Sequence, residues 1–300
     1  MKKAVFLFFL ISFTFNFCQS QEWMNSLDVA KRLALVQDKM LFVVWENTTL
    51  DTFPVILDNG KGGVISRDLF EDNDINQVVW EYFIPVIIKE SDYEALFNKI
   101  KDKRDAVYID KFNDNSIKIM DANGNILNTN SLEYGYGVTD LTFLLDNYAL
   151  RTTYLKQELA NYSKKKTLST VYNLASKYLD FSIHVNTSIR TEVIDLAHFY
   201  LEEAIEILKN DSTSNKSALE QKCELLKLNH HLIVNRPKKA LRLLKKFKGI
   251  EIEKINQYLF SYLHYTAYKL LKDEEKAMTW KPKVLNTDLN KANLILKINL

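Results

Sequence analysis

The stretch 26–45, SLDVAKRLALVQDKMLFVVW, and the tetrapeptide ENTT that follows it decide the fold of the first half of this chain. Residues 27–37 carry apolar side chains at helical spacing, and Ser26 is placed to cap that helix. Residues 40–45 form an unbroken run of apolar and aromatic side chains, which is typical of a buried strand. We therefore expect a helix that leads directly into a central strand ending at Trp45.

The segments downstream alternate between helical and strand patterns. Residues 68–82 and 92–101 each predict a helix, and residues 83–89 (FIPVIIK) between them predict a second buried strand. The segment 47–63 contains a proline and several glycines, so we expect it to be at least partly loop.

A hairpin and a closing helix complete the first half. Residues 116–120 and 125–128 flank the turn sequence Asp-Ala-Asn-Gly, and Asn-Gly between apolar runs is a strong hairpin signal. Residues 139–149 predict a helix, and the Gly-Tyr-Gly sequence at 135–137 reads as a loop. This order of elements predicts a mixed α/β domain over residues 21–150.

The second half has no strong strand signal before its last residues. Amphipathic segments separated by short polar joints predict an antiparallel helical array over residues 151–300. Two helix pairs within it would fit repeats of a tetratricopeptide-like (TPR-like) solenoid. The apolar run 294–298 fits either a docking helix or a strand. The expected helices span residues 153–163, 167–179, 189–209, 217–233, 237–248 and 252–271.

Charge divides the chain in the same way. Of its 300 residues, those at 21–150 include 12 Lys and Arg against 22 Asp and Glu, whereas 151–300 include 26 against 16. Such asymmetry supports a domain boundary near residue 150. The two halves would then attract one another, or the basic half would dock on an acidic partner. The whole chain has a net charge of only +2, so we expect no nucleic-acid partner.

The N-terminus has the pattern of a secretory signal peptide over residues 1–20. Lys2 and Lys3 precede an apolar run at 4–17, which is shorter than the roughly 20 residues needed to span a bilayer. Small residues precede a predicted cleavage site before Gln21. A lipid anchor on Cys18 is the alternative. We expect an exported protein, periplasmic or extracellular, that associates at most peripherally with a membrane.

Four segments of the first half resemble the exported kind of thioredoxin-like protein. These are the helix and strand of 26–45, the segment DLFEDNDINQVVWEYFIPVII, the hairpin sequence SIKIMDANGNIL and the last helix at 139–149. The resemblance covers about residues 23–150. It implies a thioredoxin-like fold in which a Trp-Cys-x-x-Cys motif follows the central strand and a cis-proline faces it.

The redox residues of that family are missing here. Aligned on Trp45, Glu46 takes the place of the first cysteine and Thr49 that of the second, and neither can form a mixed disulfide. The nearest equivalent of the cis-proline is Asn115-Ser116. After removal of the signal peptide, Cys223 is the only thiol, and its helical context predicts a core residue. We therefore expect no catalytic residue.

No other pattern identifies a cofactor or metal site. All five histidines lie in the helical half without the spacing of a metal motif, and His230 and His231 point about 100° apart on a helix. The segment beginning at Asp121 resembles the opening of a calcium loop, but Ile126 and Leu132 stand where glycine and glutamate are needed. We expect neither a metal nor a cofactor.

The helical half offers a candidate partner surface. A cationic amphipathic segment at 236–248 and an aromatic-rich helix near its end are its two parts. Helical arrays commonly bind partners along their extended surfaces. The alternatives are a solvated basic face and an aromatic core stripe. The candidate surface comprises Arg236, Lys238, Lys239, Arg242, Tyr258, Tyr262 and Tyr265.

These observations favour a non-catalytic binding or scaffold protein whose partner is a protein or an envelope component. The competing hypothesis is a relative of thiol-disulfide oxidoreductases that uses unconventional residues. A structural subunit held to the cell envelope is a third.

Overall fold

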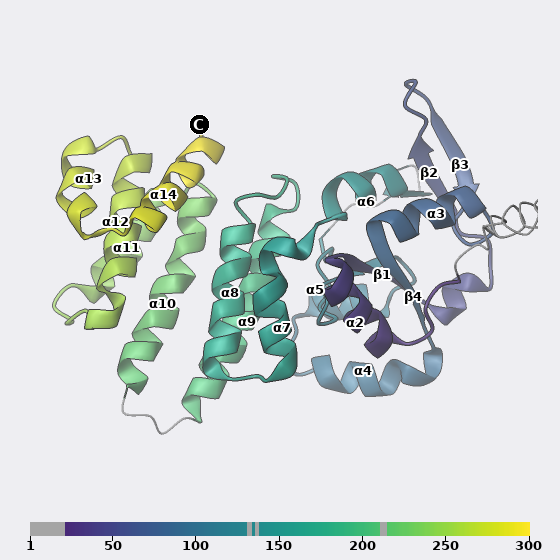
Figure 1. The fold of residues 1–300 in the computed structure, drawn as a ribbon, viewed down its shortest axis with the longest axis horizontal. Coiled ribbons are helices and arrows are strands. Elements are labelled where there is room, and N and C mark those ends of the chain that lie inside the picture. Colours follow the sequence, from purple (N-terminus) through teal and green to yellow (C-terminus); the bar gives the residue numbers. More distant parts are fainter. Residues whose placement is uncertain (1–21, 131–133, 136–137, 211–214) are drawn as a thin grey trace, which may run out of the picture.

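The computed structural model describes residues 22–130, 134–135, 138–210 and 215–300. The expected signal peptide lies outside the described residues. Figure 1 shows an α/β unit formed by the first half of the chain and a row of helices formed by the second. This arrangement confirms the expected class, an α/β unit followed by a helical array.

A three-stranded sheet forms the centre of the first unit, with strand order β4-β1-β5. Strand β1 (Met40–Trp45) pairs in parallel with β4 (Phe83–Ile88) along its full length, Met40 opposite Phe83 and Trp45 opposite Ile88. On its other side β1 pairs antiparallel with β5 (Lys118–Met120). Every residue of β1 is buried. The predicted central strand is therefore confirmed, and its apolar run exists because both faces are covered.

Helices cover both sides of this sheet. Helix α2 (Leu27–Gln37) precedes β1 as expected and ends at Asp38, whose left-handed backbone redirects the chain into the strand. Helix α3 (Asn73–Tyr82) begins after Asp72, which caps it by accepting hydrogen bonds from two backbone amides. The remaining helices of this unit are η1 (Glu46–Thr49), η2 (Glu90–Asp92), α4 (Tyr93–Ile100), α5 (Ala106–Asn113) and α6 (Leu141–Tyr148).

A second small sheet, with strand order β3-β2-β7-β6, was not expected. Strands β2 (Pro54–Asp58) and β3 (Val64–Asp68) form a hairpin within and beyond the segment predicted to be loop. Strands β6 (Tyr134–Gly135) and β7 (Val138–Asp140) flank residues 136–137 of the predicted loop, which lie outside the described residues, and β7 pairs in parallel with β2. Only residues 54–58 of the segment predicted to be at least partly loop form a strand, so that prediction is confirmed. The second sheet was missed because β2 and β7 are far apart in the chain and their pairing leaves no local signal.

The predicted turn at Asp121 is confirmed. The Gly124 amide donates to the Asp121 carbonyl oxygen at 2.9 Å, and Met120 bridges Ile126 across the turn. Gly124 has a positive φ of 87°, which glycine adopts without strain.

The second half is helical throughout its described part. Consecutive helices pack side by side and reverse direction at each short loop, as Figure 1 shows. The C-terminal segment is a helix, which settles the alternative between helix and strand. The elements are η3 (Thr152–Leu155), α7 (Lys156–Lys164), α8 (Leu168–Phe181), α9 (Arg190–Lys209), α10 (Lys216–Ile233), α11 (Pro237–Leu244), η4 (Lys245–Phe247), η5 (Lys254–Asn256), α12 (Gln257–Leu270), α13 (Glu274–Trp280), η6 (Lys281–Lys283) and α14 (Asn286–Ile298).

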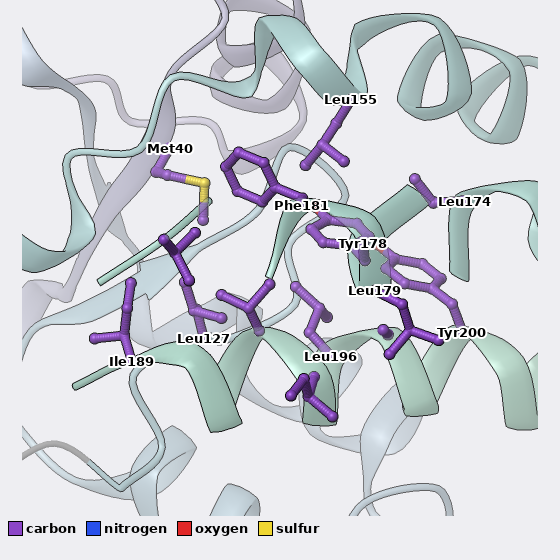
Figure 2. Packing of buried hydrophobic residues seen from close by; sticks show 14 of the residues in the cluster. Met40, Leu127, Leu155, Leu174, Tyr178, Leu179, Phe181, Ile189, Leu196 and Tyr200 are labelled. Carbon is purple, nitrogen blue, oxygen red and sulfur yellow. The ribbon is translucent and has the colours of Figure 1, made fainter. Parts of the chain in front are cut away.

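The α/β unit and the helical array share one continuous hydrophobic core. In Figure 2, Met40 from β1 and Leu127 from the β5 hairpin lie beside residues of α8 and α9. Tyr178 and Tyr200 stack with ring centroids 5.5 Å apart at this junction. Burial of large apolar side chains from both units stabilises their fixed association.

Candidate functional site

Trp45 closes the carboxyl end of the central strand. Its indole nitrogen donates to the Phe112 carbonyl oxygen at 2.8 Å, and its ring packs against Phe112 and Tyr93 with centroids 5.2 and 5.7 Å away. The side chain is 4% exposed. These contacts fix the direction in which the chain leaves the strand.

The short 3₁₀ helix η1 (Glu46–Thr49) follows directly at this strand end. The Thr49 hydroxyl donates to the Glu46 carbonyl oxygen at 2.8 Å, and the Thr48 hydroxyl donates to the Asn115 carbonyl oxygen at 3.4 Å. The segment thus faces Asn115, the position assigned to the loop that opposes the redox motif. The side chains at this strand end are a carboxylate, an amide and two hydroxyls.

A buried polar cluster lies beside η1, and sequence reasoning missed it. The Lys118 ammonium contacts the Asp114 carboxylate at 2.9 Å and the Ser116 carbonyl oxygen at 2.8 Å. Lys111 donates to the Ser116 hydroxyl at 2.8 Å, and that hydroxyl donates to Asp114 at 2.6 Å. Burial alone would raise the pKa of Asp114, but Lys118, the Ser116 hydroxyl and Lys111 outweigh it and hold that pKa below its ordinary value.

The Lys111–Lys118 cluster is a hydrogen-bond network with buried cations and a half-exposed carboxylate. Lys118 and Ser116 are 1% and 3% exposed, whereas the side chain of Asp114 is 44% exposed. The spacing of two lysines around an Asn-Asp-Asn-Ser turn was the available signal. The network fixes the loop that faces η1.

Cys223 lies on α10 and is 2% exposed. Burial raises the pKa of its thiol to about 11. The thiolate is the nucleophile in disulfide exchange, so a thiol that stays protonated and covered is unreactive. Its predicted place in the core is confirmed.

The structure divides the candidate partner surface. Arg236, Lys238, Lys239 and Arg242 are all exposed on or beside α11, and Tyr258 is 53% exposed on α12. By contrast, Tyr262 and Tyr265 are buried, at 1% and 6%, because α12 packs against several other helices. Those two tyrosines belong to the core, and their assignment to a partner surface was wrong.

Three histidines cluster between α9 and α10. The rings of His198 and His230 lie 4.6 Å apart, and those of His230 and His231 lie 3.8 Å apart. Burial, with the neighbouring His230, Lys227 and His231, lowers the pKa of His198 to about 4. Within the described ranges no three His, Cys, Asp or Glu side chains form a group suited to a metal ion.

A cleft of about 1330 Å³ opens between the α/β unit and the helical array. Helices α2 and α4 and the Asp121 turn form one wall, and the end of α7 and the outer face of α9 form the other. Its volume exceeds the roughly 300–1,000 Å³ of typical small-molecule sites. No sequence pattern indicated this cleft, because its walls come from segments far apart in the chain.

Arg104 lies in this cleft between two aromatic rings. Its guanidinium carbon is 3.1 Å from the ring centroid of Phe199 and 4.2 Å from that of Tyr108. One of its terminal nitrogens donates to the Asn125 side-chain oxygen at 2.6 Å. Burial lowers the pKa of this arginine, although nearby Tyr108, Tyr200 and Asp121 oppose the shift. The side chain is rigidly held and contributes donors to the cleft.

Among the described residues, no helix combines the length and the apolar character required to cross a bilayer. Comparisons of the chain with protein-family models, with curated proteins and with solved structures found no match.

Proposed function

We propose that this protein is an exported, non-catalytic binding or scaffold protein, in which a thioredoxin-like unit without redox thiols is joined to a helical partner-binding array. The replacement of the thiol pair by Glu46 and Thr49 at the end of the central strand carries this proposal. The exported location rests on the sequence pattern of residues 1–20.

The strand order supports the thioredoxin-like part of the proposal. The parallel pair β1–β4 and the antiparallel pair β1–β5 have the arrangement that the resemblance implies around the central strand. At the two edges of this sheet, a single bridge joins Met24 to Val86 of β4 and another joins Ile126 to Met120 of β5. Function must still be argued from the site, because one fold serves many activities.

The chemistry at the strand end supports the non-catalytic part. A disulfide exchange needs an accessible thiolate, and Cys223 is buried on α10 with a raised pKa. Glu46 and Thr49 instead make backbone contacts within and beside η1. An oxidoreductase with unconventional residues would therefore have no thiol nucleophile among the described residues at this strand end.

The helical array supports the binding part. The exposed cations of α11, at Lys238, Lys239 and Arg242, form a basic strip suited to an acidic protein or an anionic envelope component. The succession of helix pairs from α8 to α12 fits a TPR-like array, which exposes extended surfaces to partners.

Two measurements test the proposal. In an insulin-reduction assay the mature protein, alone and as Cys223→Ser, should give no turnover above background. Turnover that disappears in the serine variant would show an oxidoreductase instead. Affinity capture from envelope extracts with the full mature chain should recover a defined partner, and Lys238→Glu/Lys239→Glu/Arg242→Glu should reduce its recovery.

A further inference from the structure

The cleft between α2 and α9 has an excess of positive charge. Its lining holds eight cationic and five acidic side chains. Three of the acids are already paired: Asp28 with Lys31 at 3.6 Å, Glu203 with Lys166 at 2.8 Å and Glu202 with Lys227 at 3.5 Å. Within the part of the chain that the structure describes, six lining cations have no ion-pair partner within 4 Å: Arg32, Lys99, Lys103, Arg104, Lys164 and Lys165.

Arg104 differs from the other five because it is held in place. Stacking on Phe199 and Tyr108 fixes the plane of the guanidinium, and Asn125 binds one of its nitrogens. An arginine stacked in this way presents its remaining donors in a fixed fork, which matches a carboxylate in a bidentate geometry. Its side-chain acceptors, the Asn125 amide oxygen and the Tyr108 hydroxyl, are neutral, so among the described residues no carboxylate contacts its positive charge directly.

The surroundings of Arg104 indicate the size of the ligand. The cleft volume of about 1330 Å³ accommodates an extended segment better than a single small anion. Lys103 is the neighbour of Arg104 in the chain, and Lys164 and Lys165 lie at the end of α7 on the opposite side. Positive side chains therefore lie on both walls of the cleft around Arg104.

We propose that this cleft binds an acidic peptide segment, with Arg104 as the bidentate anchor for one of its carboxylates and the lysines at the rim attracting the rest. This assignment names a ligand class and a site for the binding function proposed above, and it rests on that function.

The probe is a fluorescein-labelled oligo-glutamate peptide, titrated with the full mature protein and followed by fluorescence anisotropy. The wild type should bind it, more weakly as ionic strength rises. Arg104→Gln should weaken binding about tenfold or more, and Arg104→Lys should also weaken it, because lysine keeps the charge but loses the fork. Arg151→Gln, which removes the same charge from an exposed position outside the cleft, is the matched control and should bind as the wild type does.

A double variant at the rim of the cleft tests the assignment independently of whether the Arg104 variants fold. Lys103→Gln/Lys165→Gln removes two exposed cations and should weaken binding severalfold while leaving the thermal unfolding temperature unchanged. The assignment is wrong if the wild type does not bind the peptide, if Arg151→Gln weakens binding as much as Arg104→Gln does, or if polyphosphate binds and the peptide does not. None of these outcomes depends on the insulin assay, so failure here leaves the non-catalytic proposal separately testable.

Discussion

The Tyr200 hydroxyl on α9 donates a hydrogen bond to the Asp121 carboxylate at the turn after β5, and Asp121 is completely buried. Tyr178 on α8 donates to the same carboxylate at 3.1 Å. The backbone amides of Asn123 and Asn125 each donate to it at 2.9 Å. One carboxylate thus joins the α/β unit to two helices of the array and accepts hydrogen bonds from both sides.

Asp121→Ala should lower the free energy of unfolding by about 2–4 kcal/mol, because it leaves several buried donors without an acceptor. Tyr200→Phe should cost about 1–2 kcal/mol, since Asp121 keeps its other donors. Urea denaturation followed by circular dichroism measures both. Tyr258→Phe, which removes an exposed hydroxyl, is the control and should have no effect. Equal stability of Asp121→Ala and the wild type would show that this carboxylate does not hold the units together.

The sequence predicted the elements that local pattern specifies. The central strand was predictable because a strand buried on both faces requires an apolar run, here residues 40–45. The turn was predictable because its positive φ favours glycine, here Gly124 in the pair Asn123-Gly124. Helix α5 was missed because it is only eight residues long and has no clear apolar stripe. Its one sequence signal is the N-cap residue Asp105. The β2–β7 pairing was missed because parallel partners distant in sequence have no local signature.

The sites were harder to predict, since they depend on packing. A helical wheel places Tyr258, Tyr262 and Tyr265 on related positions, but it does not show that neighbouring helices cover two of them. In the same way, Asp121 and Arg104 gain their roles only where the turn and α9 meet. That neither Glu46 nor Thr49 is a cysteine follows from residue identity alone, whereas their correspondence to a redox pair stays a prediction.

Acidification should destabilise the helical array through its buried histidines. Burial lowers the pKa of His264 to about 4, from an ordinary value of 6.5. As the pH falls below 6.5 the unfolded chain binds the proton first, so stability present above pH 6.5 is lost progressively toward pH 4. His198 has the same direction of shift and adds to the loss.

His264→Phe should reduce this pH dependence and keep the stack on Trp280, where the ring centroids are 4.2 Å apart. Between these two pH values the wild type should lose up to about 1.4 kcal/mol per pH unit more than the variant does. Urea denaturation over a series of pH values measures the difference. Exposed His184→Gln is the control, and a slope equal to that of the wild type is expected from it. An unchanged slope in His264→Phe would contradict the assignment.

Cys223 should be inert in the native protein. At about pH 8.5, where an ordinary thiol is half ionised, Ellman's reagent should label it slowly or not at all, because its pKa is raised to about 11 and its side chain is buried. Addition of guanidinium chloride should release one thiol per mature chain within the mixing time. Fast labelling without denaturant would contradict the burial of α10 at this position.

Glu46→Cys/Thr49→Cys should create a redox-active pair if the α/β unit is thioredoxin-like. Positions 46 and 49 are three residues apart in the 3₁₀ helix η1, so their side chains project from the same side of it. The double variant should form an internal disulfide, detected by mass after alkylation, and should reduce insulin above the background of the wild type. Each single variant provides one thiol and should show neither property. A double variant that stays reduced under oxidising conditions would count against a thioredoxin-like geometry at this strand end.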